Sequence, residues 1–258
     1  MSAAARLRRL VPPAATIAAL LILWEAASRF GGLPAWLLPS PSAIVQAGLS
    51  VDAGQWLRHL LATLRIVVLG FAVALAVSLP LAFAITQSDL IRRCVYPILV
   101  VIQSTPIVAI APILIVTFGP TDVPRVIITA MIAFFPLVVG ISTGLAETPP
   151  ELVELSRSLG APRWRQYWEI RMPAAVPYIF AAVKISITLA VIGAVVAEFV
   201  AAEEGIGYFI RASTAFFKIP RAFAALAVLV AISLGLFHLT VLVQRLLFPR
   251  SLKTATDK

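Results

Sequence analysis

Apolar runs separated by short polar stretches dominate the pattern along the chain. A helix crosses the ~30 Å hydrocarbon core of a bilayer with about 20 mostly apolar residues. By that measure the runs predict six membrane spans, at about residues 11–27, 60–85, 95–118, 125–145, 177–199 and 223–247. We therefore expect an all-α integral membrane protein in which residues 1–258 form a single transmembrane domain.

The first apolar run has two interpretations. Arginines before it and small residues after it, at positions 26–28, are also typical of a secretory signal peptide. The prolines at positions 12 and 13, and Trp24 and Glu25 near the end of the run, do not suit a signal peptide. We favour a first transmembrane helix that begins in the cytoplasm.

The third predicted span contains three prolines, Pro97, Pro106 and Pro112. Breaks inside a bilayer are tolerated where protein or a water-filled cavity satisfies the freed backbone groups. Three polar residues directly precede the middle proline near mid-depth: Gln103, Ser104 and Thr105. They are our candidates for a solute path. The alternative is that these small polar groups form hydrogen bonds between helices.

Residues 148–173 form the one long polar segment between spans, and their pattern predicts two short helices. Thr148 can cap the first helix, with Glu151 completing a capping box. Gly160 suits the left-handed conformation that ends a helix, and Pro162 can open the second helix. The second helix is predicted to end at the proline at position 173. A hairpin of this kind between spans is suited to binding by another protein.

Composition places the chain among integral membrane proteins, with 60% apolar residues, 13% charged residues and a mean hydropathy of +0.98. With the N-terminus inside, thirteen of the 21 Lys and Arg residues fall on inner segments and seven on outer segments, while Lys184 lies within a span. This bias predicts cytoplasmic termini and a cytoplasmic hairpin. The net charge of +9 follows these scattered loops, so it does not indicate nucleic acid binding.

Motifs for catalysis are missing from the sequence. It has no phosphate-binding loop, no H-E-x-x-H and no G-x-S-x-G, and its one cysteine and two distant histidines suggest no metal site. We therefore expect no catalytic residue, no metal and no cofactor on this chain, and a membrane enzyme is the weakest alternative.

A gradient-driven transporter or channel is the stronger alternative, and it would place ionisable residues within its spans. The candidates are few: Glu25, Arg65, Lys184 and Glu198. Lys184 lies roughly 10 Å into the fifth span at 1.5 Å per residue. From there it can extend to the membrane surface, or it can attract an anionic solute along the translocation path.

The hairpin resembles the EAA motif of permeases of ATP-binding-cassette (ABC) importers. That motif reads Glu-Ala-Ala, three residues, Gly, nine residues, Ile, one residue, Leu-Pro. Glutamate, glycine, isoleucine and proline fall in register here, while Leu and Ser replace the alanines and Met replaces the leucine. The matching positions, which the resemblance assigns to ATPase coupling, are Glu154, Leu155, Ser156, Gly160, Ile170, Met172 and Pro173.

Further segments resemble the nitrate, sulfonate and taurine group of these permeases, including residues 39–41, 103–106, 135–136, 190–199 and 205–208. That group also includes permeases for pyrimidine precursors of thiamine and for riboflavin. The resemblance implies a type I importer permease: six transmembrane helices, with a cytoplasmic helix-turn-helix between the fourth and fifth, in a bacterial inner membrane.

The partners implied by the resemblance are a second permease copy, two cytoplasmic ATPase subunits that use ATP and Mg²⁺, and an extracytoplasmic solute-binding protein. The solute would be a small sulfonate-, taurine- or nitrate-like anion, or a pyrimidine- or riboflavin-type vitamin or precursor. Glu203, Glu204 and Gly205 lie on the outer side and are candidates for an external gate or receptor contact; a solvated turn is the alternative.

Overall fold

Helices make up all of the regular structure among the residues that the computed structural model describes, which are 3–249 without 33 and 35, with side chains from residue 11 onward. The elements are α1 (Ala3–Phe30), α2 (Pro41–Leu49), α3 (Ala53–Gln87), α4 (Asp89–Ser104), α5 (Ile107–Phe118), α6 (Asp122–Ala146), α7 (Pro150–Ser158), α8 (Arg163–Arg165), the π-helical turn η1 (Gln166–Arg171), α9 (Met172–Ala201), α10 (Ile206–Ala215) and α11 (Ile219–Leu247).

Five helices in the described part of the chain are long and apolar enough to cross a membrane, and a sixth span results if α4 and α5 are counted together. These two helices meet at an angle of 88°. The break lies at Thr105 and Pro106, as the prolines of this segment predict. Each of the six expected apolar segments thus lies on one helix or on this bent pair. The basic tail from residue 250 and the arginine side chains before residue 11 lie outside the described residues.

The core of the bundle lies where α6 packs between α3 and α9. Ile66 of α3, Leu137 of α6 and Ala190 of α9 are almost completely buried there. Small residues let the backbones approach closely. Thr129 of α6 lies against glycines of both neighbours: a Cβ built on Gly70 would be 2.4 Å from the Thr129 side chain, and one built on Gly193 would be 2.9 Å from the Thr129 Cα.

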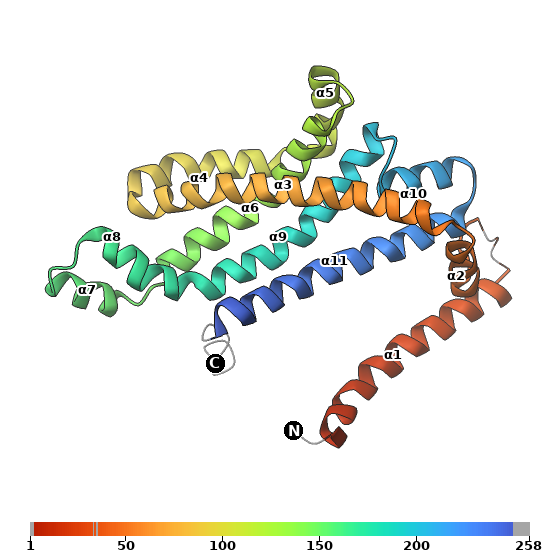
Figure 1. The fold of residues 1–258 in the computed structure, drawn as a ribbon, viewed down its shortest axis with the longest axis horizontal. Coiled ribbons are helices and arrows are strands. Elements are labelled where there is room, and N and C mark those ends of the chain that lie inside the picture. Colours follow the sequence, from red (N-terminus) through yellow and green to blue (C-terminus); the bar gives the residue numbers. More distant parts are fainter. Residues whose placement is uncertain (1–2, 33, 35, 250–258) are drawn as a thin grey trace.

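Most of helix α1 lies apart from this bundle (Figure 1); its last turns contact α2, and Trp24 lies beside Phe223 of α11 with ring centroids 6.2 Å apart. None of the most apolar window of α1 is buried within the chain. The link to α2 is polar: the Glu25 carboxylate accepts hydrogen bonds from the Ser42 amide at 3.0 Å and the Ser42 hydroxyl at 2.7 Å. The apolar surface of α1 is therefore free to contact lipid or another subunit.

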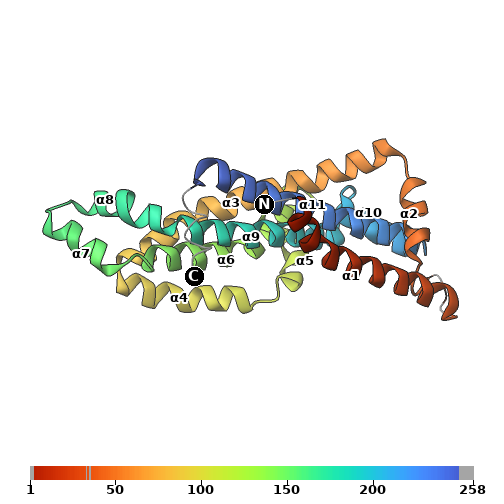
Figure 2. The same cartoon turned by 90° about the horizontal axis from the view of Figure 1, so that it is seen from below.

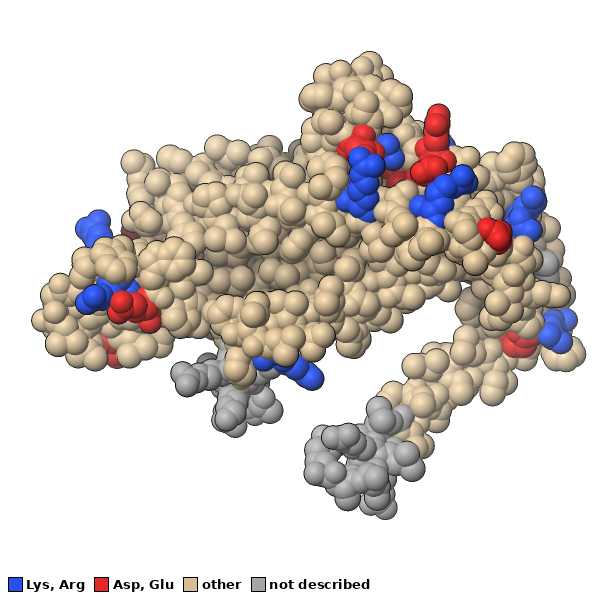
Figure 3. Space-filling model, in the orientation of Figure 1, with Lys and Arg blue, Asp and Glu red and all other residues tan. Residues whose placement is uncertain are grey.

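The two ends of the long axis differ in structure. The hairpin of α7, α8 and η1 lies at one end, and α2 and α10 lie near the other, in both views (Figures 1 and 2). On the face shown in Figure 3, charged side chains gather at the hairpin end and from the base of α5 to the other end, and the stretch between carries few charges. This distribution fits a bundle that crosses a membrane along its long axis.

Candidate functional site

The first half of the hairpin ends in the conformation that its glycine predicts. Gly160 has a φ of +69°, and the amides of Gly160 and Ala161 donate to the carbonyls of Arg157 and Ser156 at 2.9 and 3.0 Å. These two bonds form a Schellman motif, which closes the end of α7 and turns the chain toward α8. A residue with a side chain would be strained at this position.

The predicted capping role of Thr148 is wrong. Its hydroxyl donates to the Leu145 carbonyl at 3.2 Å, so Thr148 satisfies the end of α6 instead of the start of α7. Helix α7 begins two residues later at Pro150, with Pro149 before it and no side-chain cap. A proline suits this first position because it has no backbone N–H that would need a partner.

The predicted end of the second helix at Pro173 is also wrong. Pro162 does precede a helix, as expected, but the helical path continues without interruption from Arg163 to Ala201. The π-turn η1 lies directly before Pro173, and the Met172 amide donates to the Tyr167 carbonyl, five residues back. Proline cannot donate to the helix ladder, and a wider turn accommodates that local disruption. The second half of the hairpin is therefore continuous with the membrane-spanning helix α9.

The hairpin exposes large apolar side chains instead of burying them. Five large apolar side chains of the hairpin are between 47% and 77% exposed: Leu152 and Leu155 of α7, Leu159 directly after it, and Trp164 and Trp168 of the second half. We call these five residues the hairpin apolar face. Ser156 and Gln166 are buried, and the Gln166 amide donates to the Ala161 carbonyl at 3.1 Å, which holds the two halves of the hairpin together.

Aromatic contacts attach the hairpin to the end of α3. Tyr167 and Trp168 lie beside Phe83, with ring centroids 6.1 and 6.3 Å apart, and the Tyr167 hydroxyl donates to the Thr86 carbonyl at 3.4 Å. The Arg171 guanidinium lies 5.0 Å from the Tyr167 ring centre. This anchor has no local signal in the sequence, because residues of two distant segments form it.

The structure places the residues that match the EAA motif along the whole hairpin. Glu154 and Leu155 are exposed on α7, Ser156 is buried behind them, and Gly160 is at the turn. The remaining three lie where the hairpin joins α9: Ile170, Met172 and Pro173. Ile170 and Met172 are half-buried and Pro173 is exposed. The motif therefore covers both the exposed surface and its connection to the bundle.

The candidate path residues meet at the break between α4 and α5. Gln103 and Ser104 are exposed and Thr105 is half-buried. The two hydroxyls donate to carbonyls one turn back in α4, Ser104 to Val100 at 2.8 Å and Thr105 to Val101 at 2.9 Å. Neither hydroxyl bonds to a neighbouring helix among the described residues. Lys184 is half-buried on α9, which is far along the chain from the α4–α5 break. It has no ion pair with another described residue.

A buried polar cluster joins α3, α9 and α10 at the opposite end of the bundle. The Thr63 hydroxyl donates to Glu198 Oε1 at 2.8 Å, and the Gly207 amide donates to Glu198 Oε2 at 2.7 Å. The Ile206 amide donates to Thr63 Oγ1 at 2.8 Å. The Gly205 amide donates to His59 Nδ1 at 3.2 Å. We call these residues the Glu198 cluster; they fix the start of α10.

A charged cleft of about 570 Å³ lies beside the Glu198 cluster. Asp122 forms ion pairs with Arg65 and Arg125, and Glu204 and Arg211 also line the cleft. Glu203 and Glu204 are exposed, and Glu204 lies 3.6 Å from Arg58. The acidic pair is thus at the rim of a polar opening at this end.

Comparison with known proteins gives one consistent family. A family model described as binding-protein-dependent transport system inner membrane component matches residues 67–253. The chain is 34% identical to the formylaminopyrimidine transport permease protein ThiX of Halalkalibacterium halodurans, over 81% of this chain and 84% of that protein. It is 35% identical to the riboflavin transport system permease protein RibX of Chloroflexus aurantiacus, over 90% and 87%.

A more distant relative and a solved structure agree with this assignment. The taurine transport system permease protein TauC of Escherichia coli is 24% identical over 84% of this chain and 82% of its own. The fold matches a chain of the MetNI methionine ABC transporter with a TM-score of 0.67 at 19% identity, covering 75% of this chain and 96% of that one. The resemblance to ABC importer permeases, including the sulfonate and taurine group, is confirmed.

Proposed function

Because the chain belongs to the family of binding-protein-dependent transport system inner membrane components and is a permease subunit of an ABC importer, we propose that it couples ATP hydrolysis to transport through its 148–173 hairpin. The single observation that carries this proposal is the hairpin apolar face. Leucines and tryptophans so exposed at the polar end of a membrane bundle are suited to burial in a partner protein.

The chemistry of the hairpin suits a groove on the ATPase subunit. The apolar face would enter the groove, and the arginines at its edge, Arg157, Arg163 and Arg165, would face acidic groups of the partner. ATP and Mg²⁺ would be bound by that partner, and this chain would contribute no catalytic residue and no cofactor.

Movement of the ATPase would reach the bundle through two rigid connections. One is the unbroken helix from Arg163 to Ala201, and the other is the aromatic contact between Tyr167 and Phe83 of α3. Since α6 packs between α3 and α9, the three helices would move as a body when two ATPase subunits close.

The membrane orientation follows from the charges. The chain is a multi-pass inner-membrane protein. We propose that the hairpin and both termini are cytoplasmic, because more of the basic residues then lie inside. The Glu198 cluster and the charged cleft would then face outward, where Glu203 and Glu204 could contact a solute-binding protein.

The solute would be of a kind that the relatives' names give: a sulfonate or taurine, or a pyrimidine- or riboflavin-type vitamin or precursor. A nitrate-like anion is a further candidate that rests on the resemblance of the sequence alone. The path would run between two permease copies past the break in α4 and α5, with Gln103, Ser104 and Thr105 exposed toward it and Lys184 as a further candidate. The receptor would select the solute.

A pull-down in mild detergent tests the coupling proposal. The wild-type chain should recover an ATPase subunit, and a variant with Glu154→Lys and Gly160→Asp should not. A matched control carries the same changes at the other end, Glu203→Lys and Gly119→Asp, because Glu203 is exposed and Gly119 has a similar φ of +75°. This control should recover the ATPase normally. Absence of an ATPase from every sample would favour the alternative, a gradient-driven carrier or channel.

A further inference from the structure

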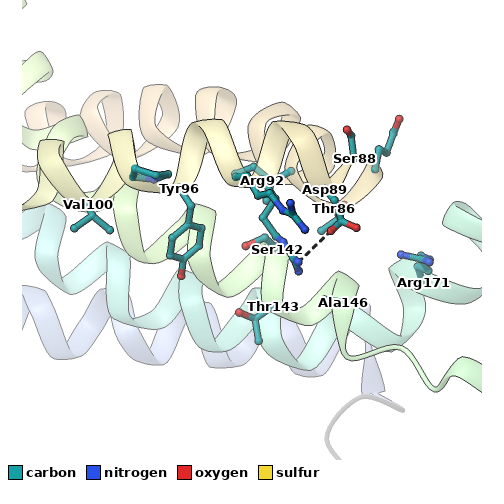
Figure 4. A pocket seen from close by; sticks show the side chains of 14 residues that line it. Thr86, Ser88, Asp89, Arg92, Tyr96, Val100, Ser142, Thr143, Ala146 and Arg171 are labelled. Atoms are coloured by element: carbon teal, nitrogen blue, oxygen red, sulfur yellow. Dashed lines mark ion pairs between the residues drawn. The ribbon is translucent and has the colours of Figure 1, made fainter.

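A cavity of about 970 Å³ opens beside the hairpin, between the end of α3, the first turns of α4, the end of α6 and the π-turn η1. Figure 4 shows Arg92 and Tyr96 extending from α4 toward Ser142 and Thr143 of α6, with Arg171 at the rim. Its size suits a small ligand or the polar part of a larger one. Neither the coupling hairpin nor the candidate path residues at the α4–α5 break account for it.

The charged residues that line the cavity leave an excess of positive charge. Arg92, Arg93 and Arg171 line it together with one carboxylate, Asp89. Asp89 forms an ion pair with Arg92 at 3.0 Å. The Arg93 side chain has no ion pair with another described residue. One arginine is therefore neutralised within the chain, and two remain to attract an anion.

Arg171 also has an unused hydrogen-bond donor. Its Nε is buried and has no hydrogen-bond partner within the described part of the chain, although its guanidinium lies over the Tyr167 ring. A buried donor without an acceptor is costly, and most of all on a charged group. Arg171 lines the cavity, so a small rotation of its side chain would bring this donor to a ligand oxygen there.

The rest of the lining is amphipathic. Gln87, Tyr96 and Thr143 offer amide and hydroxyl groups, while Pro97 and Val100 offer an apolar wall further along α4. A ligand with an oxyanion at one end and carbon atoms at the other would match this distribution. A planar guanidinium group binds an oxyanion such as phosphate through two parallel hydrogen bonds, which favours an oxyanion over a neutral ligand.

We infer that this cavity is a binding site for a phosphate- or sulfonate-type oxyanion, held by Arg93 and Arg171. Two sources offer this chemistry. One is the headgroup of an anionic membrane lipid, because basic pockets between helices near the cytoplasmic surface attract such headgroups. The other is a free anion that enters from the water at the hairpin end. This inference concerns the chain alone and does not depend on docking of an ATPase.

The test measures the unfolding temperature of the full chain in lipid nanodiscs. The first comparison is phosphatidylcholine discs against discs that also contain phosphatidylglycerol, which presents a lipid phosphate. The second is phosphatidylcholine discs in sodium chloride against sodium sulfate or sodium phosphate at equal ionic strength. Binding should raise the unfolding temperature of the wild type by about 3 °C or more in one of the two comparisons.

The variants assign that rise to the cavity. The pocket variant is Arg93→Gln with Arg171→Gln, and the control is Arg157→Gln with Arg245→Gln, two exposed arginines that do not line the cavity. The control removes the same charge and corrects for general salt effects. The rise should be lost in the pocket variant and kept in the control. A rise only with phosphatidylglycerol identifies a lipid headgroup, and a rise with sulfate or phosphate identifies a free anion.

Two outcomes would overturn the inference: no rise in the wild type in either comparison, or an equal rise in the pocket variant and the control. If the double variant does not fold, Arg93→Gln alone decides, because the Arg93 side chain is exposed and its loss leaves the packing unchanged. Arg171→Lys, which keeps the charge but not the fork of donors, should keep part of the rise.

Discussion

The Thr63 hydroxyl donates to the Glu198 carboxylate at 2.8 Å, although the two residues are 135 positions apart in the chain. The same hydroxyl oxygen accepts the Ile206 amide at 2.8 Å. Thr63 therefore links α3 to both α9 and α10 through one atom. Glu198 and Thr63 are almost completely buried, so water cannot replace either bond.

Replacing Thr63 with valine should destabilise the chain with little change in side-chain volume. The substitution leaves Glu198 Oε1 and the Ile206 amide without their partner, at about 1–3 kcal/mol for each buried group. The unfolding temperature in detergent should fall by several degrees, at roughly 2–4 °C for each kcal/mol. Thr117→Val is the control, because that hydroxyl is exposed and bonds only within its own helix; an equal fall in both variants would contradict the linking role.

Replacing Gly205 with alanine should be more damaging than the same change at Gly160. Both glycines have positive φ angles, +116° and +69°. A Cβ at Gly205 would lie 2.3 Å from the Glu198 carboxyl carbon, whereas nothing lies within 4 Å of a Cβ at Gly160. Gly160→Ala should therefore cost only the backbone strain, about 1–2 kcal/mol. Thermal unfolding of both variants compares them; equal stability would mean that α10 can shift away from Glu198.

The spans and the hairpin turn could be predicted from sequence because each depends on local chemistry. Hydropathy over about 20 residues marks a helix that crosses a membrane, and a glycine between two helical patterns marks a left-handed turn. The break at Pro106 follows from the same kind of rule. In each case the residues that determine the structure are neighbours in the chain.

The Glu198 cluster could not be predicted in the same way. His59 looked isolated in the sequence because its partner is a backbone amide 146 positions away. The role of Thr148 depended on competition between two helix ends, which the capping pattern does not resolve. The π-turn also has no sequence signature of its own, so a helix that continues past Pro173 was predicted to stop there. These features depend on packing between distant segments.

Replacing Leu155 with serine should weaken ATPase binding without destabilising the permease. Leu155 is 58% exposed on α7, so the unpartnered chain loses little apolar contact. In a complex the leucine would be buried, and its loss would cost about 1–3 kcal/mol of binding free energy. Leu49→Ser, at a leucine that is 82% exposed on α2, is the control. A co-purification assay and a melting curve measure the two effects; weaker binding in the control variant as well would contradict the specific role of the hairpin.

Replacing Phe83 with alanine should separate binding of the ATPase from movement of the bundle. The substitution removes the ring that contacts both Tyr167 and Trp168, but it leaves Leu152, Leu155 and Gly160 of the hairpin in place. The ATPase should still bind, because the exposed leucines and the turn are unchanged. The hairpin would then transmit its movement mainly through α9, since the Tyr167 hydroxyl bond to the Thr86 carbonyl is what remains of its contact with the end of α3.

The measurement is solute uptake for each ATP hydrolysed in proteoliposomes that contain the ATPase and the receptor. We expect this ratio to fall several-fold in Phe83→Ala while ATPase recovery stays at the wild-type level. Phe237→Ala on α11 is the control, because Phe237 is partly exposed and contacts His238 of the same helix instead of the hairpin. A normal ratio in Phe83→Ala would mean that α9 alone carries the movement. Loss of ATPase recovery would instead make Phe83 a support for the shape of the docking surface.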